Sequence, residues 1–138
     1  MKKSLFILFL LVSSFVFAQQ TPVEVPVIGV KVPIGESVSL KDVSIKFVEV
    51  LEDSRCPKFT TCIWAGRARV LVEVTVNGKT EKEILIFGEV KSGEEESTNL
   101  YSSVDFAING LAVNPYPSSE NPEKITDYEL LICEGKNN

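Results

Sequence analysis

Two cysteines near the middle of the chain, Cys56 and Cys62, have five residues between them. Thiols at this spacing can close a small structural disulfide loop or act as a redox pair. Redox pairs usually have only two intervening residues and lie at a helix N-terminus, which lowers the thiol pKa, and this stretch has neither property. The sequence therefore predicts a structural disulfide formed in an oxidising compartment.

The third cysteine, Cys133, is flanked by apolar residues near the end of the chain. We expect it to be a free, buried thiol, because a β-like stretch surrounds it. The alternatives are an exchange partner for the bridged pair or an intermolecular bridge, since an odd cysteine in an exported protein can have either role.

Positive charge gathers around the predicted loop, although the chain as a whole has a net charge of -5. One interpretation is a solvated strand face on which Arg55 pairs with Asp53 or Glu52, and such a surface ion pair contributes little to stability. The other is a patch that contacts an anion or an acidic partner. An apolar residue, Phe59, lies in the middle of the loop, and the only tryptophan, Trp64, follows it. The candidate binding residues are Arg55, Lys58, Phe59, Trp64, Arg67 and Arg69.

The tryptophan has two possible roles. We expect Trp64 to pack in or near the core beside the disulfide, because large aromatic side chains contribute most when buried. The alternative is an exposed platform on which a ligand stacks.

The composition lacks side chains that catalysis and metal binding commonly use. The chain has no histidine and its only methionine is Met1, so catalysis based on histidine has no source, and the imidazole and thioether ligands of transition metals are missing after the predicted signal. A zinc site would have to use cysteines and carboxylates alone, and one of the three cysteines is far away in the sequence. We expect no cofactor and no metal site. The acidic run Glu94–Glu96 is expected to be a solvated loop, because calcium needs convergent oxygen ligands. The acidic balance also argues against nucleic acid and against strong binding to anionic membranes.

The first residues resemble an export signal. Lys2 and Lys3 precede an apolar run, and small residues precede a cleavage point after Ala18. We expect a signal peptide over 1–18, a mature N-terminus at Gln19, and a single β-rich domain over 19–138. The expected location is periplasmic or secreted, soluble after cleavage, with no membrane span, because the apolar run is short.

The dominant periodicity is two, which is typical of strands. Apolar residues alternate over 43–50 and 68–76, and further strands are expected at 37–40, 82–87 and 128–133. The segment 23–32 resembles an edge strand because prolines interrupt it. The best helical candidate, 102–108, could equally be a strand. These elements predict an all-β fold, an antiparallel β-sandwich or small β-barrel with a disulfide-closed loop.

Asn77 and Gly78 indicate a hairpin whose register depends on the length of its loop. A two-residue loop places Val72 opposite Glu83 and Val74 opposite Glu81. A three-residue loop instead pairs Val72 with Ile84, Val70 with Ile86 and Leu71 with Leu85. We favour the three-residue loop, because it matches more apolar side chains across the pair.

The stretch Asp53-Ser-Arg-Cys-Pro57, four residues, and then Cys62-Ile-Trp-Ala-Gly66 resembles a pattern that recurs in uncharacterised small exported bacterial proteins and lipoproteins. The resemblance is most specific over 49–76. It implies a secreted β-rich domain and carries over no activity. The chain departs from the lipoprotein members because no anchoring cysteine follows the apolar run.

These observations favour a non-catalytic binding or interaction module of the cell envelope, with an envelope protein or a glycan as partner. An inhibitor of an envelope protein is a special case, because a loop that is already ordered loses less entropy on binding. The alternative is an enzyme that acts on glycans through carboxylates such as Asp53 and Glu52, which needs no histidine.

Overall fold

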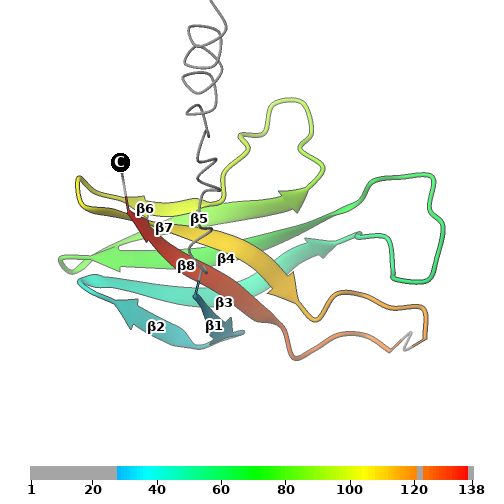
Figure 1. The fold of residues 1–138 in the computed structure, drawn as a ribbon, viewed down its shortest axis with the longest axis horizontal. Coiled ribbons are helices and arrows are strands. Elements are labelled where there is room, and N and C mark those ends of the chain that lie inside the picture. The colour runs from blue at the N-terminus through cyan, green and yellow to red at the C-terminus, as the bar shows by residue number, and fades with distance from the viewer. Residues whose placement is uncertain (1–27, 121–122, 137–138) are drawn as a thin grey trace, which may run out of the picture.

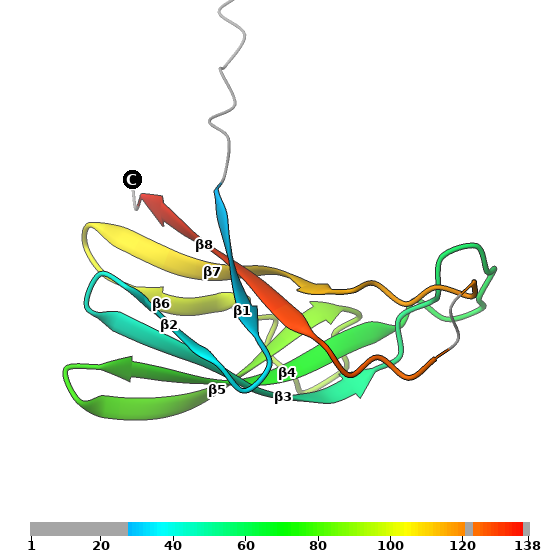
Figure 2. The same ribbon diagram turned by 90° about the horizontal axis from the view of Figure 1, so that it is seen from below.

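The computed structural model describes residues 28–120 and 123–136, so the predicted signal peptide and the start at Gln19 lie outside the described residues. The described chain forms two antiparallel sheets of four strands each, with the orders β1-β8-β7-β6 and β2-β3-β4-β5. Figures 1 and 2 show the two layers packed face to face. The strands are β1 (Gly29–Pro33), β2 (Ser37–Leu40), β3 (Val43–Asp53), β4 (Arg67–Val76), β5 (Lys79–Gly88), β6 (Asn99–Ser102), β7 (Phe106–Asn114) and β8 (Glu129–Lys136).

The predicted all-β sandwich is confirmed. The ambiguous segment 102–108 lies in β6, a short turn and β7, and no helix occurs among the described residues. The described part of the chain contains no helix that is long and apolar enough to cross a membrane.

Period-two alternation explains the core. Along β3, Val43, Ile45 and Phe47 are buried while the residues between them are exposed or half-buried, because successive side chains in a strand point to opposite faces. Alternate residues of β4 do the same from Ala68 to Val74. The opposite sheet contributes side chains such as Ile108 and Leu130 to the same core. The core therefore lies between the two sheets.

The predicted hairpin register is wrong. Val74 lies opposite Glu81 and Val72 opposite Glu83, so the loop has two residues, Asn77 and Gly78. Both loop residues have positive φ, 51° and 79°, as the two-residue turn that matches strand twist requires. Turn geometry therefore outweighs apolar matching.

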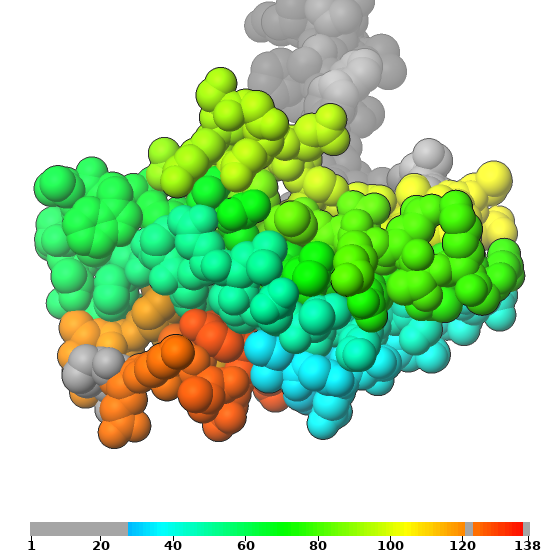
Figure 3. All heavy atoms as spheres, turned by 180° about the vertical axis from the view of Figure 1, so that it is seen from behind, coloured from blue at the N-terminus to red at the C-terminus, as the bar shows by residue number. Residues whose placement is uncertain are grey.

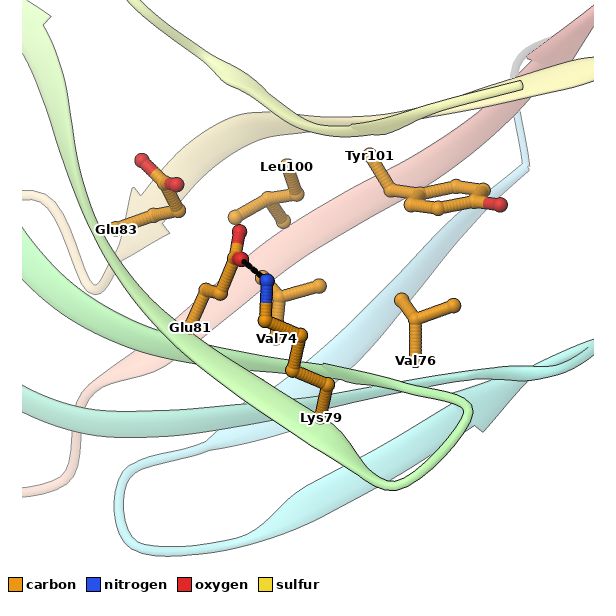
Figure 4. Close-up of a pocket in the computed structure, with 7 residues that line it drawn as sticks. All are labelled: Val74, Val76, Lys79, Glu81, Glu83, Leu100 and Tyr101. Atoms are coloured by element: carbon orange, nitrogen blue, oxygen red, sulfur yellow. Dashed lines mark hydrogen bonds and ion pairs between the residues drawn. The ribbon is translucent and has the colours of Figure 1, made fainter.

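The cost of this register is small because β5 lies at the edge of its sheet. The inward-facing charges of β5 line a pocket of about 200 Å³ that is open to solvent, and Lys79 pairs there with Glu81 at 2.7 Å (Figure 4). The pocket also contains Val74, Val76, Leu100 and Tyr101. Inward-pointing charges on an edge strand also discourage pairing with another chain.

Two long connections extend from the same end of the sandwich. Residues 54–66 join β3 to β4, and residues 115–128 join β7 to β8. They lie side by side in the ribbon views and in the space-filling view of Figure 3, where they appear in green and orange. This end contains the predicted loop and most of the candidate binding residues.

Candidate functional site

The predicted disulfide is present. Cys56 and Cys62 are bridged, with their Cα atoms 5.9 Å apart, and they close a short loop. Cys133 is a free thiol and is buried in β8, as expected. Closing so short a loop restricts the unfolded chain by about 2 kcal/mol in the chain-entropy description.

The loop is also held from outside. The Lys58 amide donates to the Pro117 carbonyl at 2.9 Å, and the Lys58 carbonyl accepts from the Ser119 amide at 3.2 Å and the Ser119 hydroxyl at 3.0 Å. These bonds form an isolated parallel bridge between the two connections. These hydrogen bonds therefore attach the disulfide loop to the 115–128 connection.

A glycine is required where the loop returns to β4. Gly66 has φ +71°, and a Cβ there would lie 2.2 Å from the Ser54 carbonyl oxygen. The same carbonyl accepts a hydrogen bond from the Trp64 indole at 3.1 Å. The close approach of residues 64–66 to Ser54 fixes how the loop leaves the sandwich.

Arg55 is a buried structural residue. Its Nε and Nη2 donate to the two carboxylate oxygens of Asp53 at 2.8 and 2.7 Å, and its other bonds reach the carbonyls of Val113 and Pro115. The Arg55 and Asp53 side chains are only 8% and 10% exposed. The predicted pairing with Asp53 is confirmed, but the pair is buried. These contacts give Arg55 a structural role at the base of the loop.

Tyr128 completes this cluster by donating its hydroxyl to Asp53 at 3.0 Å. Burial alone would raise the pKa of Asp53, but the hydrogen bonds and charge of Arg55 outweigh burial and lower it. Burial and the bond to Asp53 raise the pKa of Tyr128 to about 12.

Arg67 and Arg69 are also engaged in ion pairs. Arg67 is buried and contacts both Glu52, with Nη2 and Oε2 3.0 Å apart, and Glu94. Arg69 is half-buried and lies 3.9 Å from Glu52 and 3.7 Å from Glu94. Hydrogen bonds from Arg67 lower the pKa of Glu52, and bonds from the Lys91 amide and Arg67 lower that of Glu94. Glu94, predicted to be solvated, instead attaches its loop to the outer face of β4.

Glu52 and Asp53 are the carboxylates named for the alternative of a glycan-acting enzyme. Glu52 lies opposite Arg69 and Asp53 opposite Ala68, so the two neighbours point to opposite faces of the sheet. Both have lowered pKa values, whereas a general acid needs a raised one. Residues 28–120 and 123–136 also contain no group of three or more potential metal ligands.

Three large apolar side chains are exposed to solvent in the connection formed by residues 54–66. Phe59 is 77% exposed, Ile63 is 101% exposed and Trp64 is 56% exposed. Phe59 lies inside the ring that the disulfide closes, whereas Ile63 and Trp64 follow Cys62. We call these three exposed residues of the 54–66 connection the apolar tip. The expectation that Trp64 packs in or near the core is wrong, because its indole N–H donates to the Ser54 carbonyl while more than half of the residue is exposed. Lys58 is the one predicted cation that lies exposed beside the tip.

Ile63 was absent from the predicted set. It lies between Cys62 and Trp64 in a segment with no strand pairing, where alternation says nothing about burial. The available signal was position alone: three large apolar residues occur close together in a loop that a disulfide holds away from the strands.

Comparison with known proteins returned no match for this chain: no protein family, no curated protein and no solved structure.

Proposed function

We propose that this chain is a non-catalytic binding module of the cell envelope, and that the apolar tip is its contact surface. Phe59 carries the proposal. It has φ 64°, a backbone conformation that suits glycine or asparagine and costs a bulky residue about 1 kcal/mol or more. Its side chain is 77% exposed, so little burial within the domain offsets that cost.

A strained and exposed aromatic side chain is readily explained by a contact outside the molecule. Strained residues persist where the surrounding structure fixes them, and they gather at binding sites. Here the surrounding structure is the disulfide together with the Lys58 bridge to Pro117 and Ser119. A tip that is already ordered loses less conformational entropy when it binds.

Two features support a location in the envelope. A disulfide in a small domain is typical of an oxidising compartment. The pattern of residues 1–18 is that of an export signal. An envelope protein and a glycan are the partner classes expected from the sequence, and an inhibitor of an envelope protein would use the same tip.

The test uses two matched variants. Phe59→Asn removes the aromatic ring and retains a residue that tolerates positive φ. Val104→Asn removes a side chain that is 93% exposed in the turn before β7, at the other end of that strand from the 115–128 connection. We expect immobilised Phe59→Asn protein to lose most of its binding to envelope components, and Val104→Asn to match the wild type. Equal binding by all three proteins would refute the proposal.

A further inference from the structure

Ion pairing changes the chemistry that the loop presents. From sequence, the surface combined four cations with two aromatic residues. In the structure, Arg55 and Arg67 are buried in ion pairs and Arg69 lies between Glu52 and Glu94. Lys58 is then the exposed cation of the 54–66 connection, and its large exposed side chains are those of the apolar tip, with the small residues Ser54, Thr60, Thr61 and Ala65 exposed between and beside them. A surface of this kind is suited to an apolar phase rather than to an anion.

We infer that the apolar tip inserts into the surface of a phospholipid bilayer with zwitterionic headgroups. The inference rests on the proposed function, because it assigns a partner to the same surface. Tryptophan favours the boundary between headgroups and acyl chains, and phenylalanine and isoleucine favour the hydrocarbon side of it. Lys58, next to Phe59 in the chain, can extend its amine toward a lipid phosphate while its methylenes lie along apolar groups.

Charge determines the kind of lipid. The chain carries a net charge of -5, so an anionic bilayer repels the molecule as a whole. Near the tip, exposed Glu120 and Glu123 lie in the connection that is bonded to Lys58. Segment 54–66 contains no acidic residue, and Lys58 is its exposed cation, because Arg55 is paired with Asp53. Zwitterionic headgroups provide phosphates for Lys58 without repelling the acidic remainder.

The shape and polarity of the tip favour lipid over the two partner classes expected from the sequence. Phe59 and Ile63 have no polar side-chain atom with which to bind a sugar hydroxyl. A protein partner would need a pocket shaped to the protruding loop, whereas acyl chains adapt to any apolar protrusion. A single myristoyl chain supports reversible binding of about 10⁴ M⁻¹, and we expect the apolar tip to give binding of that order.

The experiment uses Trp64, which is the only tryptophan of the chain and lies in the tip. The purified protein is titrated with vesicles of phosphatidylcholine and phosphatidylethanolamine, and with the same vesicles containing phosphatidylglycerol. We expect the Trp64 emission to shift to shorter wavelength on the neutral vesicles, with co-sedimentation that changes less than about twofold between low and high salt, because burial of apolar groups is the main term. Brominated acyl chains should quench the emission.

Variants separate the two proposals. We expect Phe59→Asn to weaken vesicle binding about tenfold, the loss expected for one buried apolar side chain, and Val104→Asn to leave it unchanged. Binding only to anionic vesicles, abolished by salt, would overturn the lipid inference, as would a lack of binding to either kind of vesicle. If vesicles do not bind but Phe59→Asn still loses an envelope protein or glycan, the lipid inference falls and the proposed function stands. If Phe59→Asn changes no binding at all, both fall.

Discussion

Arg55 and Val113 are 58 positions apart in the sequence, yet Nη1 of Arg55 donates a 2.7 Å hydrogen bond to the Val113 carbonyl. Strand pairing between β6 and β7 ends at Asn109, so this part of β7 has a neighbouring strand only on the β8 side. The Arg55 guanidinium therefore donates to the edge of β7 that faces away from β8, where no strand among the described residues is paired with it. It also connects the start of the disulfide loop to the opposite sheet.

Replacing Arg55 should destabilise the protein strongly. In Arg55→Met the nearly buried Asp53 carboxylate loses its cation, and removing one partner of a buried pair costs about 3 kcal/mol or more. The measurement is the free energy of unfolding in urea. The control is Lys58→Met, which changes an exposed side chain and should alter the free energy by less than about 0.5 kcal/mol. Equal effects of the two substitutions would show that Arg55 is not a structural residue.

Asp53 should contribute to acid sensitivity. Because its pKa is lower in the folded protein than in the unfolded chain, its stabilising contribution is complete above the unfolded value, which is about 4. The contribution is lost as the pH falls from there through the folded value. We therefore expect the unfolding free energy of Asp53→Asn to depend less steeply on pH below about 4 than that of the wild type. Parallel curves for the two proteins would contradict this.

Tyr128 should make the free energy of unfolding depend on pH in the alkaline range. Its folded pKa of about 12 exceeds the ordinary value of 10.0, so the unfolded chain releases this proton first. The stabilising contribution is therefore complete below 10.0 and disappears as the pH rises toward about 12. An ultraviolet titration of the phenols should show a late phase that is missing from Tyr128→Phe. A wild-type titration without that phase would refute the assignment.

Phe59 gives a prediction about stability in the absence of any partner. Asparagine adopts positive φ more readily than phenylalanine does, and the exposed ring contributes little burial. The unfolding free energy of purified Phe59→Asn should equal that of the wild type or exceed it by up to about 1 kcal/mol. A clear loss in urea unfolding would mean that Phe59 stabilises the loop itself.

Local patterns predicted most of the fold. Alternation over 43–50 and 68–76 identified the inward faces of β3 and β4, because a strand that is buried on one face shows its period in the sequence. The bridge between Cys56 and Cys62 followed from their spacing and the expected export. The hairpin register failed because positive φ at Asn77 and Gly78 determined the turn, and edge position made inward-facing glutamates tolerable.

The site was harder to predict because it depends on distant partners. Arg67 is neutralised by Glu94, 27 positions away in a loop that looks merely solvated in the sequence. Arg55 bonds β7, which no local pattern indicates. The three arginines Arg55, Arg67 and Arg69 therefore appeared available although ion pairs engage them, and only Lys58 of the four predicted cations is exposed. The exposure of Trp64 and Ile63 became evident only from the structure.

Hydroxyl-radical footprinting of the protein, alone and mixed with the envelope fraction of its own cells, tests the contact surface most directly. The tip residues Phe59 and Trp64 are exposed in the isolated protein and react readily, and Tyr101 on β6 provides an internal reference away from the loop. We predict that the envelope fraction protects Phe59 and Trp64 while the oxidation of Tyr101 is unchanged. Undiminished oxidation of Trp64 in the presence of the envelope fraction would contradict the assignment of the apolar tip as the contact surface.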